Sequence, residues 1–592
     1  MKLSIIFALL GALCLCWAAW IAIKATAIRD DLGQAAHLAE KLREEVAASD
    51  SGSATRTVFE MRKHTIAAKQ AADDPLWTLA SGLPWAGPNF SAVAEVARAA
   101  DDVVGLALEP LADVYEKLDW GTLLPSTTGT DLGPLSSAAP SVSSAAYAVR
   151  ISSDRLTQID TDRLVPQISQ PLAEAAEQLQ QATGALNAAA DASRLMPLML
   201  GAEEPRDYLL IIQNNAESRA SGGIPGALAV LNLDKGKMTL GAQSTATDLG
   251  VMQPSLPVER EQQQIYSGRL GKFMQDINLT PDFPTAASTA QAMWERKTGQ
   301  RVHGVVSIDP VALGYILDAA GPAKINDPEV LRLAGNKLPT ELTGDNVVST
   351  LLSAVYANIE EPERQDAYFA GVASEIFATL SNGKSNASEL TKGLTRGAEE
   401  GRVLVWSGAE AEQSLISKYA LSGSISGPSV SPAQFGVYFN DGTGAKMDYY
   451  TKRTVQLIKG CPHDGYEETT VRITSTNTAP GDAATSLPPY VTGDGLFGVP
   501  PGSVQTNLVA YGPAQAHVEA AKLDGQKTEF APYFHGNRPV GVLAIRLAPG
   551  ESKTVDFTFG KIVQHTEPNV VVTPTVQDVK DVTLPTETAA CG

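Results

Sequence analysis

The clearest hydrophobic pattern in the chain is one uninterrupted apolar run near its amino terminus. From Leu3 to Ile23 there is no charged side chain, and Lys2 and Lys24 flank the run. About twenty residues at a rise of 1.5 Å each cross a hydrocarbon layer of about 30 Å as one helix. A cleaved signal peptide has a shorter apolar stretch of roughly 7–15 residues, although residues 24–27 can also be read as a cleavage site. We therefore predict a transmembrane anchor over residues 1–24.

The apolar positions that follow the anchor repeat with the period of a helix. Between residues 28 and 46 they recur at spacings of three and four with charged residues between them, which predicts a single apolar stripe. Later, Leu172, Leu179 and Leu186 lie one heptad apart. Narrow, alanine-rich stripes of this kind are typical of an antiparallel bundle or a stalk. We predict such a helical region over residues 25–200.

The pattern then changes to short apolar runs alternating with helical repeats. Runs typical of strands buried on both faces occupy Tyr208–Ile212, Ala227–Leu233, Gly304–Ile308 and Val403–Trp406. Asp309 and Pro310 have the types preferred at the N-cap and first position of a helix. The alternation predicts a layered α/β/α domain over residues 201–425.

The last part of the chain has the pattern of an all-β domain. Short strands separated by Pro- and Gly-rich turns are predicted at residues 454–458, 469–474, 505–511, 542–547 and 554–559. This spacing favours an immunoglobulin-like β-sandwich over residues 426–592, with the Val/Thr/Pro-rich tail as an extended strand. The predicted class is therefore α/β plus all-β, preceded by a transmembrane helix and a helical region.

The balance of charge narrows the range of partners. The 592 residues include 46 Lys and Arg but 66 Asp and Glu, which gives a net charge of −20. Nucleic acids and anionic membrane surfaces attract clustered Lys and Arg, so neither is predicted as the main partner. A divalent cation remains compatible with this charge.

The four cysteines give information about the cellular compartment of the protein. Cys14 and Cys16 lie inside the apolar run, where they act as small apolar residues. Cys461 and Cys591 are left in the body, and such a pair suits a disulfide in an oxidising compartment. Two unrelated buried thiols are the alternative. Because the positive charges flanking the anchor are nearly balanced, this pair is one reason to predict an extracytoplasmic body.

One polar segment, residues 213–226, separates the first two predicted strands. A loop at the end of a sheet is a common ligand site in α/β proteins. Paired glycines let backbone amides approach an anion, and Arg219 can hold a phosphate with two hydrogen bonds. A polar loop whose glycines serve only tight turns is the alternative. The candidate ligand-binding residues here are Asn214, Asn215, Glu217, Gly222 and Gly223.

A second polar segment, residues 276–284, offers oxygen ligands. Asp276 and Asp282 are candidate ligands for Mg²⁺, and Asn278 is a candidate ligand-binding residue. Capping of a helix that begins near Thr285 is the alternative. Thr247-Asp248 and Arg364-Gln365 are further candidates. The sequence has no HExxH motif, no close Cys/His pair for zinc and no Walker A motif.

Several of these segments together carry a family resemblance. YLLIIQNNAESRASGGIPGALAVLNLDKGKM, DINLTPDFPTAASTAQAMWERKTG, VHGVVSIDPVAL and FNDGTGAKMDYY resemble the bacterial family 4012 of domains of unknown function, over the chain from anchor to C-terminal domain. The resemblance implies a bacterial envelope protein, often encoded near surface-polysaccharide functions.

The order of elements also resembles, more distantly, the LytR–CpsA–Psr ligases, which move glycopolymers from polyprenyl-diphosphate carriers onto the cell wall. By position, Arg219, Asp248 and Arg364 match the arginines and the Mg²⁺-binding aspartate of those enzymes. Their Arg-x-Asp-Thr motif is absent here.

Two functions follow as hypotheses. The first is a membrane-anchored extracytoplasmic protein that binds or transfers polyprenyl-diphosphate-linked glycopolymer, with Mg²⁺ if it is a ligase. The second is a non-catalytic envelope scaffold or interaction protein. The position of Arg219 and Arg364 relative to a pocket separates the two.

Overall fold

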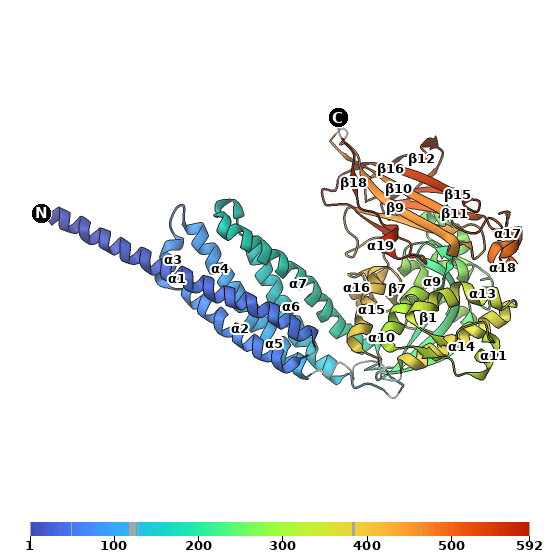
Figure 1. Cartoon of the computed structure of the whole chain (residues 1–592), viewed down its shortest axis with the longest axis horizontal. Coiled ribbons are helices and arrows are strands. Elements are labelled where there is room, and N and C mark those ends of the chain that lie inside the picture. The colour runs from blue at the N-terminus through green and yellow to red at the C-terminus, as the bar shows by residue number, and fades with distance from the viewer. Residues whose placement is uncertain are drawn as a thin grey trace. The chain divides into compact units, whose positions relative to one another are not determined.

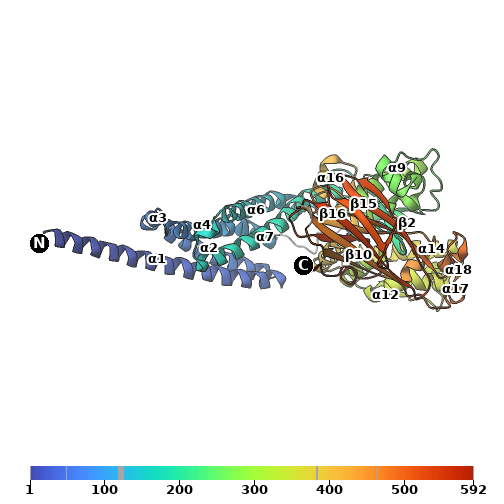
Figure 2. The same cartoon turned by 90° about the horizontal axis from the view of Figure 1, so that it is seen from above.

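A computed structural model describes residues 2–48, 50–117, 126–127, 129–381, 385–462 and 465–590 (Figures 1 and 2). The chain divides into two compact units, residues 1–123 with 131–199, and residues 124–130 with 200–592. Helix accounts for 51% and strand for 24% of the structure, so the predicted mixed α/β class is confirmed.

The first unit is helical. Its elements are α1 (Lys2–Ala47), α2 (Ser51–Ala72), α3 (Pro75–Ser81), α4 (Gly87–Val103), η1 (Val104–Leu108), α5 (Glu109–Lys117), α6 (Gly133–Thr157), η3 (Thr161–Arg163) and α7 (Pro166–Met199). Buried alanines dominate the contacts between these helices, and their small side chains let the helices approach closely. Ala68, Ala71, Ala94 and Ala97, for example, pack together with Trp77.

Helix α1 joins the anchor and the first part of the body without a break. It runs for 46 residues, about 70 Å at 1.5 Å per residue, whereas the sequence predicted a division near residue 24. The helix is long and apolar enough to span a membrane, with a mean hydropathy of 1.7 in its most apolar described window. This is consistent with single-pass anchoring.

The second unit begins with a five-stranded sheet of order β3-β2-β1-β4-β7. Its strands are β1 (Arg206–Arg219), β2 (Gly222–Asp234), β3 (Lys237–Thr245), β4 (Gly304–Ile308) and β7 (Val403–Ser407). Strand β1 is antiparallel to β2 and parallel to β4. The turn Lys235-Gly236 joins β2 to β3 with φ of 51° and 71°, the positive values that a tight hairpin turn requires.

Both faces of this sheet carry apolar side chains, as continuous hydrophobic strands require. Leu209 and Ile211 pack against the helix α9 (Phe283–Thr298). Leu210 and Ile212 pack in the cluster that holds α10 (Pro310–Ala320), α12 (Gly344–Ser349) and α14 (Pro362–Leu380). The predicted N-cap is confirmed, because the Asp309 side chain accepts from the Ala312 N–H at 2.8 Å at the start of α10.

The remaining elements around this sheet are short. They are α8 (Arg260–Tyr266), η4 (Gly268–Gly271), η5 (Met274–Leu279), α9 (Phe283–Thr298), α10 (Pro310–Ala320), β5 (Ala323–Lys324), α11 (Pro328–Ala334), β6 (Glu341–Leu342), α12 (Gly344–Ser349), η6 (Thr350–Ala354), α13 (Val355–Asn358), α14 (Pro362–Leu380), α15 (Ala387–Glu399), α16 (Glu410–Ile416) and η7 (Ala420–Ser422).

Two further sheets form the C-terminal part, in the orders β13-β12-β16-β10-β9-β18 and β14-β15-β11-β8-β17. The long strands are β8 (Gln434–Asp441), β9 (Thr451–Lys459), β10 (Glu467–Asn477), β11 (Val504–Tyr511), β12 (His517–Leu523), β15 (Arg538–Leu547) and β16 (Ser552–Ile562). The short elements are η8 (Met447–Tyr450), α17 (Ala483–Ser486), α18 (Pro489–Thr492), η9 (Gly493–Gly495), β13 (Gln526–Thr528), β14 (Ala531–His535), β17 (Asn569–Val572), α19 (Val579–Val582) and β18 (Glu587–Thr588).

The two C-terminal sheets share one hydrophobic core. Phe435 and Phe439 of β8 pack in the same cluster as Phe557 and Phe559 of β16, with Val471 of β10 beside them. All five predicted strands of this region are present. The immunoglobulin-like comparison stays a prediction.

The tail returns to the second unit as short strands. Strand β18 is parallel to β9, and the Ala589 N–H donates to the Lys459 carbonyl at 2.8 Å. The predicted disulfide between Cys461 and Cys591 involves Cys591, which lies outside the described residues, so this pairing stays a prediction.

Candidate functional site

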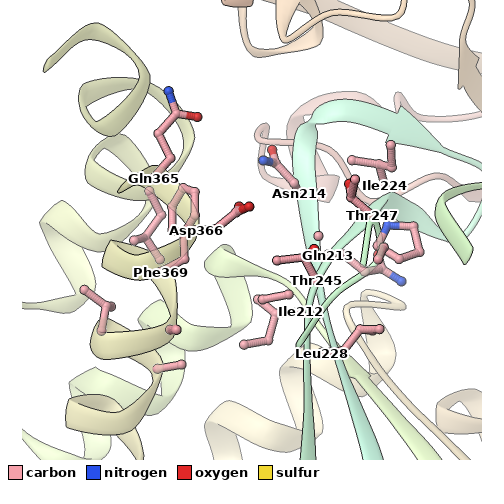
Figure 3. A pocket seen from close by; sticks show the side chains of 18 of the residues that line it. Ile212, Gln213, Asn214, Ile224, Leu228, Thr245, Thr247, Gln365, Asp366 and Phe369 are labelled. Carbon is pink, nitrogen blue, oxygen red and sulfur yellow. The ribbon is translucent and has the colours of Figure 1, made fainter. Parts of the chain in front are cut away.

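A cavity of about 400 Å³ opens between the five-stranded sheet and helix α14 (Figure 3). Ile212, Gln213 and Asn214 of β1 lie on one side of it, and Asp366 and Phe369 of α14 lie on the other. Strands β2 and β3, helix α10 and η6 complete the wall, together with Lys446 and Tyr490 from the C-terminal part. The cavity therefore depends on segments that are far apart in the sequence.

The inner wall of the cavity is apolar. Part of this wall is the apolar stripe of helix α14, a helix that begins at Pro362. Buried residues of β2, α10 and η6 form the rest. The apolar lining residues include Ile212, Leu228, Leu313, Leu351, Leu352, Phe369, Val372 and Ile376. Such a wall suits an apolar part of a ligand.

The mouth of the cavity is polar, and we call the exposed residues Thr247, Asp248 and Asp366 the cavity rim. Asp248 accepts a hydrogen bond from the Thr245 N–H at 2.9 Å, and this bond lowers the pKa of its carboxyl. The Asp366 carboxylate forms no hydrogen bond or ion pair with any residue that the structure describes. Partial burial, and then the negative charge of Asp248, raise the pKa of Asp366. The rim thus presents one carboxylate with free acceptor atoms.

The cationic side chain that lines the described cavity is already neutralised. Lys446 Nζ lies 2.6 Å from Glu217 Oε2. Burial lowers the pKa of Lys446, but the charge of Glu217, the nearby Tyr356 and Tyr490 side chains and the hydrogen bond to Glu217 together outweigh burial and raise that pKa overall. Lys446 is therefore poorly placed to pair with a ligand anion.

The polar segment predicted as a loop is instead the end of a β-hairpin. Strand β1 continues to Arg219, and β2 starts at Gly222 after a turn at Ala220 and Ser221. A Cβ at Gly222, where φ is +135°, would collide with the side-chain oxygen of Gln213, and one at Gly223 would overlap the Asn214 backbone. These glycines are required by the close approach of the two strands. The prediction of an open, anion-binding loop is therefore wrong.

Arg219 does not point into the cavity. Its guanidinium lies 3.0 Å from Glu217 Oε1 and 3.5 Å from Asp276 Oδ1, and the side chain is buried. Asp276 also pairs with Arg269 at 2.7 Å. A charge at the buried end of a hairpin needs such partners, because burying it alone is costly. Arg219 is thus a structural ion-pair partner in this geometry.

The predicted amide ligands are also engaged within the protein. Asn215 donates to Asp309 Oδ2 at 3.0 Å and to the Pro574 carbonyl at 3.1 Å. Asn278 donates to the Gly223 carbonyl at 2.8 Å. Asn214 does line the cavity, where it donates to the Tyr356 hydroxyl and accepts from the Ala216 N–H at 3.0 Å.

The three residues predicted as catalytic do not meet. Arg364 is 48% exposed, pairs with Glu361 at 3.1 Å, and is not among the described residues that line the cavity. Asp248 lies at the rim, and Arg219 lies in the hairpin. The predicted convergence of two arginines and a carboxylate is therefore wrong in this structure.

The predicted metal ligands are occupied by other contacts. Asp282 accepts from the Thr285 N–H at 3.3 Å and from the Thr285 hydroxyl at 2.6 Å, so the alternative of a helix cap is confirmed. Asp276 is held by Arg219 and Arg269. Among the described residues, no three His, Cys, Asp or Glu side chains gather as a metal site would require. Asp276 and Asp282 therefore do not fit a Mg²⁺ site.

Several lining residues were missed by sequence reasoning. Tyr356, Asp366, Lys446 and Tyr490 all contribute to the cavity. Asp366 carried one signal, because it lies three residues before Phe369, on the apolar stripe of a helix where a carboxylate is unusual. The others lacked such a signal.

Comparison with known proteins gives one match. Residues 203–356 match the model of a family described as "Protein of unknown function (DUF4012)". A search of curated proteins found no match. The predicted resemblance is thus confirmed for residues 203–356, a shorter segment than expected, and FNDGTGAKMDYY lies outside it. The matched segment contains β1 to β6 and ends at Tyr356. The resemblance to LytR–CpsA–Psr ligases stays a prediction.

Proposed function

We propose that this chain, a member of the DUF4012 family through residues 203–356, is a membrane-anchored extracytoplasmic protein of the cell envelope. Its cavity binds an amphipathic glycan ligand, such as part of a lipid-linked glycopolymer. Binding without transfer is the activity that the geometry supports best.

Support for the location comes from the two ends of the chain. Helix α1 is apolar enough to serve as an anchor. A disulfide between Cys461 and Cys591 would join β9 to the tail, whose Ala589 N–H donates to the Lys459 carbonyl. Such a disulfide is stable outside the cytoplasm.

The single observation that carries the ligand class is the free carboxylate of Asp366 above an apolar wall. Asp366 can accept hydrogen bonds from ligand hydroxyls, which is a role for ionised carboxylates. Phe369, one turn further along α14, offers a ring beside it. A ligand with hydroxyls at one end and an apolar portion at the other satisfies both.

Transfer from a diphosphate carrier is supported less well. A transferase of this kind needs cations on the leaving diphosphate. Arg219 and Arg364 lie away from the cavity, and Lys446 is paired. The second candidate is a diphosphate held through Mg²⁺ on the rim, and the like charges of Asp248 and Asp366 favour this candidate.

Calorimetric titration of the full chain in nanodiscs tests the proposal. The probes are a short alkyl glycoside and an isoprenyl diphosphate, the latter with and without Mg²⁺, and empty nanodiscs provide the blank. We expect the glycoside to bind. Asp366→Asn should weaken it about tenfold or more, since a hydrogen bond to a charged group contributes about 1.5–3 kcal/mol.

Arg364→Gln is the matched control, because it changes a charged residue two positions away that does not line the cavity. It should leave the affinity unchanged. If only the diphosphate binds, and only with Mg²⁺, the second candidate replaces the first. If neither probe binds, the cavity is not a glycan site and the scaffold hypothesis stands.

A further inference from the structure

Helix α3 lies against α1 at the point where the apolar run ends. Trp20 Nε1–H donates to Asp74 Oδ1 at 3.3 Å, and Lys24 Nζ lies 3.4 Å from Asp74 Oδ2. Asp74 is also the N-cap of α3, where it accepts from the Leu76 N–H at 2.9 Å. One carboxylate thus holds the start of α3 to the first polar turn of α1.

Helix α3 is also fixed from its other side. Trp77 is buried, donates to the Phe90 carbonyl at 3.1 Å, and packs edge-to-face on the Phe90 ring at 5.0 Å. The segment from α3 to the start of α4 is therefore packed onto the helical unit on one side only.

The other side of this segment is apolar and exposed. Trp85 is 91% exposed and Leu79 is 64% exposed, with Leu76 and Leu83 also exposed. No charged residue occurs between Asp74 and Glu95. Scattered exposed apolar residues are common, but four within ten residues, without a charge among them, indicate a contact surface.

The position of this surface identifies what it contacts. Tryptophan and lysine at the end of an apolar helix mark the boundary between hydrocarbon and headgroups. Trp20 and Lys24 have these types and flank the end of the run at Ile23. Because Asp74 binds both, the apolar surface of α3 lies at the level of the headgroups.

We propose that residues 75–87 form a second membrane contact, an interfacial element that inserts Leu79 and Trp85 into the leaflet crossed by the end of α1. The partner is the lipid surface. The absence of charge in residues 75–87 favours apolar insertion over attraction to anionic headgroups. This inference rests on the membrane anchoring in the proposed function and does not involve the cavity.

Site-specific photocrosslinking tests the inference in the full chain. Leu79 and Trp85 are replaced, one at a time, by p-benzoylphenylalanine, and the protein is reconstituted in phosphatidylcholine vesicles. Lipid adducts after illumination are measured by mass spectrometry. Phe59 and Tyr147 are matched controls, because they are 59% and 60% exposed but lie on α2 and α6. Phe59 is fifteen residues from Asp74 along the chain, about 20 Å by helical rise. Leu13, inside the apolar run, is the positive control.

We expect lipid adducts at Leu13, Leu79 and Trp85, with yields at the last two about fivefold or more above those at Phe59 and Tyr147. Adducts at Leu13 alone would overturn the inference while leaving the anchor intact. Absence of adducts at Leu13 as well would overturn the anchor and the inference together. Equal yields at all exposed positions, or crosslinks from Trp85 to a second copy of the chain instead of lipid, would also overturn it.

Discussion

Two polar regions of the second unit both contain carboxylates but have opposite organisation. The first, which we call the hairpin-tip cluster, lies at the end of β1 and β2 and consists of Glu217, Arg219, Asp276, Asp441 and Lys446. The second is the cavity rim. In the cluster, both cations have carboxylate partners within 3.0 Å. At the rim, Asp366 has no partner among the described residues.

The difference teaches how a ligand site is distinguished from a structural one. Burying a charged side chain without a partner costs free energy. A buried segment that joins two parts of the protein therefore needs its charged side chains to pair with other protein groups. A group that meets solvent at the mouth of a cavity can remain unpaired at little cost and accept a ligand. Polar residue types alone do not separate these cases.

The largest expected effect comes from removing the central cation of the hairpin-tip cluster. Arg219→Ala leaves Glu217 and Asp276 buried with one partner fewer each. We expect the free energy of unfolding to fall by about 3–5 kcal/mol, the cost of breaking a buried pair. Denaturant unfolding measures it. Arg364→Ala, in an exposed pair, is the control and should change stability by less than about 0.5 kcal/mol. A stable Arg219→Ala protein would show that the cluster is not structural.

The second prediction concerns the pH dependence of the same cluster. Burial, and then the charges of Asp448 and Glu217, raise the pKa of Asp441 to about 7 from 3.8. Between these values the folded protein binds more protons at Asp441 than the unfolded chain does. The contribution of Asp441 to the free energy of unfolding therefore falls as pH rises from about 4 to about 7.

Asp441→Asn removes this titration while keeping the size of the side chain. We expect the variant to be more stable than wild type by about 2–4 kcal/mol at pH 8, given about 1.4 kcal/mol per pKa unit, and nearly equal to it at pH 4. Thermal unfolding at the two pH values checks the difference. A constant difference at both would mean that Asp441 does not titrate in this range.

A third prediction concerns Tyr356, at the boundary between the hairpin-tip cluster and the cavity rim. The Tyr356 hydroxyl accepts a hydrogen bond from Asn214, and its ring packs near Tyr490 and Phe369 at 5.8 and 5.9 Å. Tyr356→Phe keeps the ring but leaves the Asn214 amide without this acceptor. We expect a loss of about 1–2 kcal/mol in the free energy of unfolding, measured by denaturant titration. Tyr356→Leu, which also removes the ring, should cost more, and equal costs would assign the whole effect to the hydroxyl.

The smallest effect is expected at the rim. Asp366→Asn removes a charge that repels Asp248 and breaks no hydrogen bond with the described residues. We expect stability to change by less than about 0.5 kcal/mol, because surface substitutions away from buried networks usually have small effects. Thermal unfolding without ligand measures it. A large loss would place Asp366 with the structural cluster.

Much of the fold follows from local patterns in the sequence. The apolar run of residues 3–23, the strand Gly304–Ile308 and the Asp309 cap were all predicted, and the structure has a helix, a strand and an N-cap at these positions. These features depend on the periodicity of apolar residues and on helix capping. Both involve residues that are close together in the chain, so a single sequence is enough to predict them.

The candidate site did not follow in the same way. The composition of the segment between the first two strands was compatible with a ligand loop as well as with a polar loop of tight turns. In the structure, Gly223 serves the close approach of β1 and β2, and Arg219 pairs with Glu217. The cavity instead unites Asn214, Asp248, Asp366 and Tyr490, which are separated by up to 276 positions. Whether a polar side chain is paired or free depends on what the folded chain places beside it. The sequence therefore determined the elements and their types, and only the tertiary structure, through long-range packing, decided which polar residues remained open to a ligand.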